Sequence, residues 1–209
     1  MKKNILVIHT GGTISMMEDV STGEVIPGKE NPLSVQTSIV SNLANITVEE
    51  AFHLPSPHIT EQHMYQLKEL IEEKYKEKAF DGAVITHGTD TLEETAYFLD
   101  LTISLPISIV VTGAMRSSNE IGADGLYNLI SSVRVAADSK SKNKGVLVVL
   151  NDEIHSAKNV TKHTQATFLP SKARNMDQLE LLQKEAYFFT TNLLPLRAIK
   201  FAISQNELL

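Results

Sequence analysis

Four short apolar runs, separated by longer segments with helical spacing, constrain the fold of this chain more than any other feature. The runs are NILVI from Asn4, GAVIT from Gly82, ISIVVT from Ile107 and GVLVVL from Gly145. Each is rich in β-branched residues and apolar on both faces, as expected of a strand buried in a parallel sheet. Strands that alternate with helices predict an α/β fold, a doubly wound and mostly parallel sheet with right-handed crossovers.

The segments between these runs carry apolar stripes at helical spacing. The clearest begins after Thr60, which we expect to cap a helix that ends near Lys78. Its stripe comprises Met64, Leu67, Leu70, Ile71 and Tyr75. Two shorter stripes follow, the first of Leu92, Ala96 and Leu99, the second of Leu126, Leu129, Ile130 and Val133. These segments predict the helices that cover the sheet.

Composition excludes several classes of function. The formal net charge is -6 and the basic residues are scattered, so neither a nucleic-acid nor a membrane-surface partner is expected. Cysteine is absent, which removes disulfides, thiolate nucleophiles and Cys-based zinc sites, and the seven histidines show no metal-binding spacing. We therefore expect no metal and no cofactor. The apolar run at the N-terminus is too short for a secretion signal, and we expect a cytoplasmic protein.

Polar segments follow all four runs: HTGGTIS, THGTDT, TGAMRSSNE and NDEIHSAKNVTK. Because the carboxyl ends of parallel strands meet at one edge of a sheet, these segments are expected to form a shared ligand site there. The chain has neither a GxxxxGK[ST] nor a GxGxxG motif, which disfavours nucleotide binding.

The residue types of these segments suggest a threonine nucleophile. Thr13 follows a Gly-Gly turn but needs a base. Lys162 would be a base for one of the threonines if burial keeps its amine neutral, with Asp90 orienting the pair. Each residue alone also has a structural interpretation. Asp90 or Thr91 would cap a helix, Glu93 and Glu94 would favour its N-terminal dipole, and a single lysine is usually a solvated surface group.

Four segments, TGGTIS, HGTDTLEETAYFL, TGAMRSSNEIGADGLYN and NDEIHSAKNVTK, resemble those of the bacterial-type L-asparaginases, in family-like order and spacing. The resemblance runs from about Lys3 to Lys162. It implies the N-terminal domain of that fold, with the second, smaller domain missing, and hydrolysis of L-asparagine to L-aspartate and ammonia.

The resemblance also implies roles for particular residues. Thr13 would be the nucleophile that forms a β-aspartyl ester, and Thr89, Asp90 and Lys162 would activate either this nucleophile or the water. Ser56 would hold the substrate's α-carboxylate and Asp90 its α-amino group. Gly88, Thr89 and Ala114 complete the predicted substrate site, with backbone N–H groups near Thr89 and Ala114 polarising the amide carbonyl.

The chain departs from the family's pattern in two places. Val25 stands where related sequences carry a tyrosine on a mobile loop, which bears on loop closure and on the orientation of Thr13. After Lys162 the apolar residues show no clean period, as a shifted reading frame would produce. We therefore predict a catalytic domain at residues 1–162 and a divergent tail at 163–209.

The sequence leaves two alternatives to a working hydrolase. The first is a catalytically impaired paralogue that retains ligand binding or only an assembly surface. The second, an amidotransferase component acting on a tRNA-bound substrate, is disfavoured because the chain has no basic patch. For the hydrolase we expect a homo-oligomer, provided that the missing domain is not essential for assembly.

Overall fold

A six-stranded sheet forms the centre of the protein. The computed structural model describes residues 2–18, 22, 25–27, 37–164, 167–170, 180–181 and 201–202. The sheet has the order β4 (Asn45–Leu54), β1 (Asn4–Gly11), β5 (Gly82–Thr86), β6 (Ser108–Thr112), β7 (Val146–Leu150) and β8 (Glu153–Ser156). The first five strands are parallel and β8 is antiparallel to β7, which confirms the predicted α/β class.

The four predicted strands are the inner ones, and the two that the sequence analysis missed are the edges. All five residues of β5, β6 and β7 are buried, as a parallel strand covered on both faces must be. β4 is half-exposed along most of its length and mixes charged with apolar residues, so it lacks a continuous apolar run. β8 is short and contains His155.

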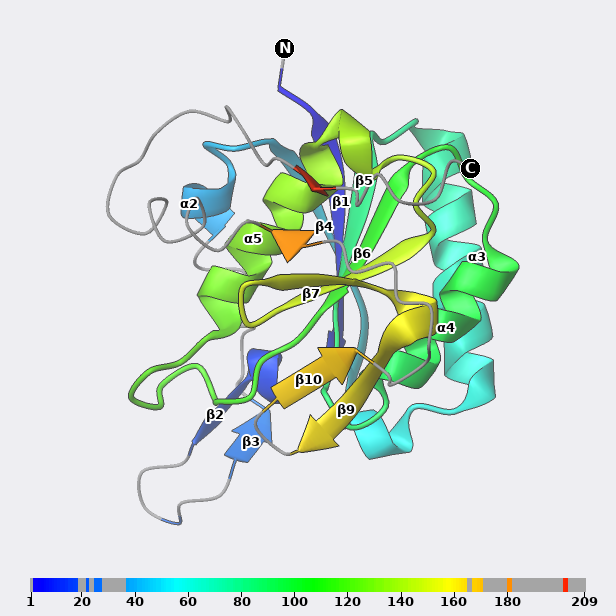
Figure 1. Ribbon diagram of the computed structural model, residues 1–209. Helices are drawn as coiled ribbons and strands as arrows, with labels where there is room; N and C mark the ends of the chain where they lie inside the picture. The colour runs from blue at the N-terminus through cyan, green and yellow to red at the C-terminus, as the bar shows by residue number, and fades with distance from the viewer. Residues whose placement is uncertain are drawn as a thin grey trace.

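Helices cover both faces of the sheet (Figure 1). α3 (Glu61–Glu77) and α4 (Leu92–Thr102) pack on one face, against residues such as Leu6 and Ile8. α5 (Gly125–Ala137) and the short α2 (Thr37–Val40) lie on the other face, where Ile5 and Val7 point. The predicted helices are thus confirmed, including the start of α3 after Thr60.

One connection has the opposite hand to the expected one. From β4 through β5 and β6 to β7 the chain moves across the sheet in a single direction, so right-handed crossovers would place all three helices on one face. α5 lies on the opposite face from α3 and α4, which makes the β6–α5–β7 connection left-handed (Figure 1). The long link at residues 113–124 carries the chain over the end of β6 to that face.

Short elements extend from the carboxyl edge of the sheet. β2 (Met16–Glu18) pairs with β3 (Val25–Pro27), and β9 (Val160–Thr164) pairs with β10 (Thr167–Pro170), both antiparallel. The segment NDEIHSAKNVTK is therefore a hairpin strand, a 3₁₀ turn at Ala157–Asn159 and the start of β9 rather than one loop. β11 (Glu180–Leu181) and β12 (Phe201–Ala202) form a further short pair.

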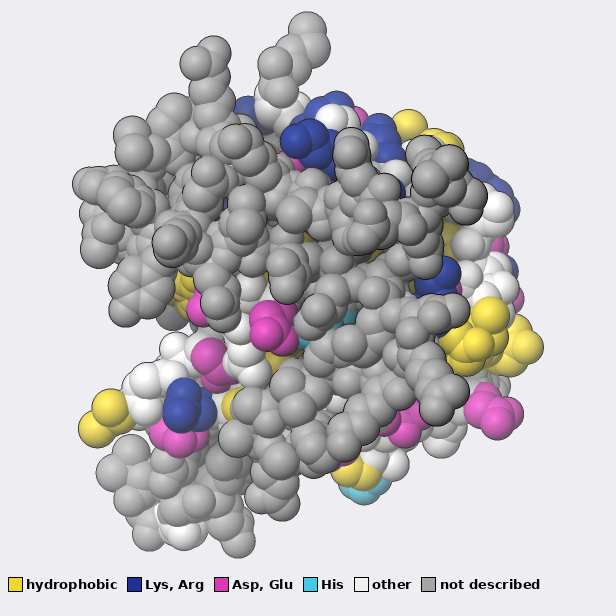
Figure 2. Space-filling model, in the orientation of Figure 1, with side chains coloured by type: hydrophobic (Ala, Val, Ile, Leu, Met, Phe, Trp, Pro, Cys, Tyr) yellow, Lys and Arg dark blue, Asp and Glu magenta, His cyan; other side chains and the backbone are white. Residues whose placement is uncertain are grey.

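Most of the predicted tail at 163–209 lies outside the described residues. Within the described part, none of the helices has both the length and the apolar character needed to cross a membrane. Among the described side chains visible in Figure 2, most lysines and arginines gather at the upper edge, where the strands begin. The carboxyl edge lies at the other end of the sheet.

Candidate active site

Close backbone contacts bring the ends of β1, β4 and β5 together. A Cβ on Gly12, whose φ is 78°, would come within 2.3 Å of the Gly88 Cα atom. A Cβ on Gly88 would lie 2.6 Å from the Ser56 Oγ atom. Because only glycine permits such approaches, the Thr13, Ser56 and Gly88 segments are in contact. They meet where β1 separates β4 from β5, the kind of switch point at which α/β sheets bind ligands.

The end of β6 joins the same group of loops. A Cβ on Gly113 would lie 2.7 Å from the His87 carbonyl oxygen and 3.1 Å from the Thr89 Cγ2 atom. Ala114 follows Gly113 and is buried. The polar segments that follow β1, β5 and β6 therefore converge as predicted. The fourth segment reaches them through Lys162 in β9.

The two threonines around the Gly-Gly turn differ in their surroundings. Thr10 is 1% exposed and its hydroxyl donates to the Thr86 carbonyl oxygen at 2.9 Å, so it stabilises the turn. Thr13 begins a 3₁₀ turn (Thr13–Ser15) and is half-buried. Among the residues that the structure describes, its hydroxyl has no hydrogen-bond partner. Of these two hydroxyls, that of Thr10 is therefore the one engaged by a described residue.

Lys162 reaches from β9 to the segment after β5. Its Nζ donates to the Asp90 Oδ1 atom at 2.6 Å and to the Thr89 Oγ1 atom at 3.2 Å. The Lys162 side chain is 18% exposed and that of Asp90 is 59% exposed. Three of the four predicted catalytic residues thus lie in direct contact, and Thr13 lies on the loop that touches Gly88.

Ser56 links the end of β4 to Asp90. The Ser56 Oγ atom accepts the Asp90 N–H at 3.1 Å and lies 3.5 Å from the Asp90 Oδ2 atom. The Ser56 carbonyl accepts the Thr91 hydroxyl at 2.8 Å. The structural interpretation expected Asp90 or Thr91 to cap α4, but neither residue does so through its side chain. Thr91 occupies the cap position, but its hydroxyl is bonded to Ser56.

Asp124, the residue before α5, and Asn128 of α5 order the loop that carries Ala114. The Asp124 carboxylate accepts the backbone N–H groups of Met115 and Arg116, each at 3.0 Å. The Asn128 side chain donates to the Gly113 carbonyl oxygen and to Asp124, also at 3.0 Å. The sequence analysis missed both residues, because their partners precede them in a long link without a regular pattern.

The sequence analysis also missed the contact between Glu93 and β9. The Glu93 carboxylate accepts the backbone N–H of Lys162 and, at 3.2 Å, the Thr161 hydroxyl. Its position in the first turn of α4 suggested only a helix-dipole role. The contact with Lys162 spans 69 residues of sequence, and no local signal indicates it.

Two buried histidines lie behind these loops. The His9 Nδ1 atom is 2.7 Å from the Thr86 Oγ1 atom, and burial, with a contribution from the charge of His53, lowers the pKa of His9 to about 4. Burial also lowers the pKa of His87. The His87 Nδ1–H donates to the Gly88 carbonyl oxygen, which only accepts, so Nε2 faces the Thr95 hydroxyl as acceptor. His87 therefore steadies the Gly88 segment as a neutral ring.

No cluster of metal-ligating side chains occurs in the described part of the chain. Val25, the residue at the family's tyrosine position, lies in β3, and its side chain is outside the described set. Among the described residues, the site presents the hydroxyls of Thr13, Ser56 and Thr89, the Asp90 carboxylate and the Lys162 amine.

Known proteins are similar to this chain in sequence and in fold. The family model "Asparaginase, N-terminal" matches residues 4–194, which extends beyond Lys162, where the sequence analysis ended the resemblance. L-asparaginase of Bacillus licheniformis is 41% identical over 162 residues, covering 78% of this chain and 50% of the relative. Glutaminase-asparaginase of Acinetobacter glutaminasificans is 39% identical over 173 residues, covering 79% and 52%.

A crystal structure gives the same result for the fold. "Probable Cytoplasmic L-asparaginase" from Campylobacter jejuni superposes with a TM-score of 0.71 at 37% identity, covering 81% of this chain and 52% of that one. The chain spans about half the length of the relatives it matches. Since the family model covers most of its residues, the chain belongs to the asparaginase family, of which it carries the N-terminal domain.

Proposed function

We propose that this chain carries the catalytic half of an amidohydrolase that converts L-asparagine and water to L-aspartate and ammonia. The observation that carries the proposal is the contact of Lys162 with Thr89 and Asp90 beside the loop of Thr13. A hydroxyl is a weak nucleophile unless a neighbouring group accepts its proton. Lys162, Thr89 and Asp90 supply an amine, a hydroxyl and a carboxylate beside the loop that carries Thr13, which supports this proposal.

In the first half of the proposed reaction, Thr13 Oγ1 attacks the side-chain amide carbon of asparagine. The C–N bond of the resulting tetrahedral intermediate breaks, and the proton from the Thr13 hydroxyl leaves with the nitrogen as ammonia. Aspartate remains bound as a β-aspartyl ester of Thr13. In the second half a water attacks the ester carbonyl, one water proton returns to Thr13, and aspartate is released. Thr89 and Lys162 accept and return this proton in one or both halves of the reaction.

The remaining predicted residues hold the substrate. Asp90 uses one carboxylate oxygen for Lys162, which leaves Oδ2, near Ser56, for the α-ammonium group of asparagine. The Ser56 hydroxyl faces the same place and suits the α-carboxylate. Backbone groups of Gly88, Thr89 and Ala114 would then face the amide, where N–H donors stabilise the developing oxyanion.

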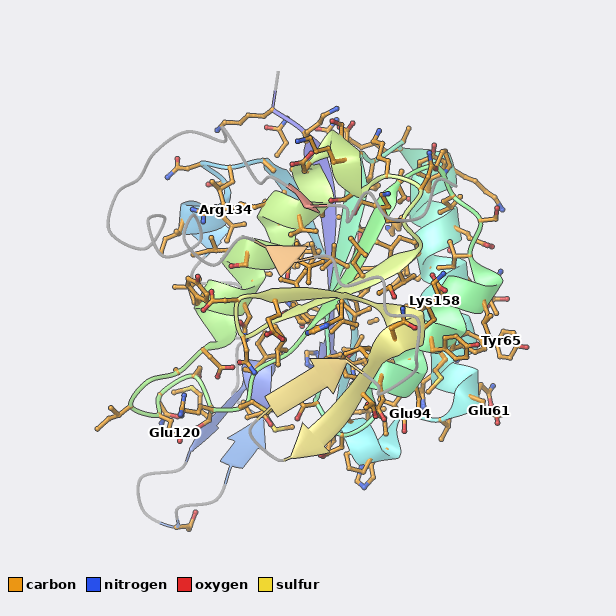
Figure 3. The ribbon with its side chains drawn as sticks, in the orientation of Figure 1. Glu61, Tyr65, Glu94, Glu120, Arg134 and Lys158 are labelled. Atoms are coloured by element: carbon orange, nitrogen blue, oxygen red, sulfur yellow. The ribbon has the colours of Figure 1, made fainter. Side chains whose placement is uncertain are left out.

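The first test is release of ammonia from L-asparagine by the purified chain, with L-glutamine measured in parallel. We expect Lys162→Met to lower kcat by roughly 10²–10⁴, the contribution of a positioned proton-transfer group. Thr13→Ala should abolish formation of the ester, which trapping with hydroxylamine detects. Lys158→Met is the matched control, because Lys158 is exposed in the turn before β9 (Figure 3). Equal rates for the two lysine variants would remove Lys162 from the mechanism.

Assembly and compartment are further parts of the proposal. A homo-oligomer is expected by analogy with the family, and sedimentation velocity measures it directly. A cytoplasmic location is supported by the similarity to the probable cytoplasmic L-asparaginase of Campylobacter jejuni, and fractionation of cells expressing the chain tests it.

A further inference from the structure

β9 lies outside the main sheet, yet it carries the lysine on which the proposed site depends. It pairs only with β10 among the described strands, and Lys162 faces Phe168 in that register. In a two-stranded antiparallel ribbon, alternate N–H groups of each strand point away from the partner and need an acceptor elsewhere. Among the described elements, β9 also contacts α4, and Val160 at its start belongs to the apolar layer on that face of the sheet (Figure 1).

Glu93 supplies such an acceptor for Lys162 itself. One carboxylate oxygen accepts the Lys162 backbone N–H and the other accepts the Thr161 hydroxyl at 3.2 Å. Both oxygens are thus engaged with consecutive residues of β9. Hydrogen bonds to a charged acceptor are stronger than those between neutral groups.

The same short stretch of chain therefore holds Lys162 at both ends. Thr89 and Asp90 bind its amine, and Glu93, three residues after Asp90, binds its backbone. A lysine side chain has four rotatable bonds and loses much conformational freedom when its amine is fixed. Fixing the backbone as well restricts the amine to the position from which it reaches the Thr89 hydroxyl.

We propose that Glu93 is a positioning residue, which clamps the backbone of Lys162 to α4 so that the Lys162 amine is held on Thr89 and Asp90. The expected effect of Glu93 on turnover rests on the proposed function, whereas its expected effect on the position of the Lys162 amine does not. The competing explanation is that Glu93 only favours the N-terminal dipole of α4, a role that Glu94 shares equally.

Glu94 provides the matched control. It occupies the same first turn of α4 and is exposed (Figure 3). Glu93→Ala and Glu94→Ala therefore remove the same charge from the same helix end, but only the first removes the contact with β9. Glu93→Gln keeps one acceptor for the Lys162 N–H, while its amide group can donate to the Thr161 hydroxyl, so it should partly rescue the alanine variant.

The first measurement is independent of catalysis. In protein labelled with ¹³C-lysine, the Lys162 Cε–Hε signal is assigned by its loss in Lys162→Met. Glu93→Ala should move this signal toward those of exposed lysines and speed exchange of the Lys162 amide by at least about 10-fold, whereas Glu94→Ala should do neither. If both alanine variants leave the signal and the exchange as in the parent, the clamp is wrong.

The second measurement concerns turnover. Glu93→Ala should lower kcat with asparagine by about 10- to 100-fold, part of what a positioned proton-transfer group contributes, with KM within about threefold of the parent. Glu93→Gln should recover most of that loss. A kcat equal to that of Glu94→Ala would show that the amine needs no clamp and overturn the inference. Absence of turnover in the parent chain would instead refute the proposed function, and the NMR signal would then decide the inference alone.

Discussion

At the scale of single residues, the carboxyl edge of the sheet combines polar groups of differing exposure, from buried Thr89 to exposed Asp90, with buried neutral histidines. The His9 and His87 side chains are each about 1% exposed and bond to the strand ends that carry the site. In the described structure the His9 Nε2 atom has no hydrogen-bond partner. A protonated ring would place an unpaired charge in an apolar layer, which is why burial lowers the pKa of both histidines.

This burial predicts a pH dependence of stability. The pKa of His9 is about 4 in the folded chain and 6.5 in the unfolded chain, so between these values only the unfolded chain binds the proton. The free energy of unfolding therefore falls as the pH drops from about 6.5 to 4, by about 3 kcal/mol in total at 1.36 kcal/mol per pKa unit. His87 acts in the same direction.

The variant His9→Asn tests the assignment, because asparagine can bond Thr86 but cannot gain a proton in this range. Urea unfolding at pH 7 and pH 4.5 should show a decrease in stability that is smaller by about 2.5 kcal/mol in the variant than in the parent. Parallel decreases in the two proteins would mean that His9 is not the titrating group.

At the scale of elements, the left-handed connection explains why the 113–124 link needs its own anchors. A right-handed crossover would lead from β6 to a helix on the α4 side, whereas this link passes over the strand ends and reaches α5 on the other face. Its backbone cannot use the sheet ladder there. Asp124 and Asn128 supply the missing partners, and they do so next to Ala114.

Asp124→Ala should therefore loosen the loop that carries Ala114. The local free energy of opening should fall by about 2 kcal/mol, the value of hydrogen bonds to a charged acceptor, and the Met115 and Arg116 amides should exchange about 30-fold faster. Asp138→Ala is the control, since Asp138 lies at the other end of α5 and its carboxylate caps a separate turn by accepting the Lys140 N–H. Similar exchange at Met115 in both variants would refute an anchoring role for Asp124.

At the scale of the whole molecule, the sequence predicted those strands and helices whose pattern of apolar residues lies within a short segment of chain. The inner strands and the three long helices were predictable because buried runs and helical stripes repeat within a few residues. The edge strands β4 and β8 were not, because half-exposed strands carry mixed residues. The hand of the α5 connection and the Glu93–Lys162 contact depend on partners distant in sequence. The candidate residues came partly from strand-end polarity and partly from family resemblance, and their catalytic roles remain predictions.

The distribution of the core predicts how much of the chain folds independently. In the described structure, every residue of the two apolar layers lies between Ile5 and Val160, and these layers cover both faces of the sheet. A sheet whose helices already cover both faces has the main requirement for a cooperative domain. We therefore expect a chain ending after Thr164 to unfold in urea as one transition, with an m-value close to that of a chain ending at Arg174.

The two shortened chains should nevertheless differ at β9. The longer one keeps β10, whose residues Thr167–Pro170 pair with Val160–Thr164, whereas the shorter one leaves β9 without this partner strand and with its contacts to α4. We expect faster amide exchange at residues 160–164 in the shorter chain and unchanged protection in β5 and β6, because their partners lie within the sheet. Loss of the cooperative transition in both chains would show that residues beyond Arg174 are required for the fold. Equal protection of β9 in both would mean that the contacts with α4, including Glu93, hold this strand without β10.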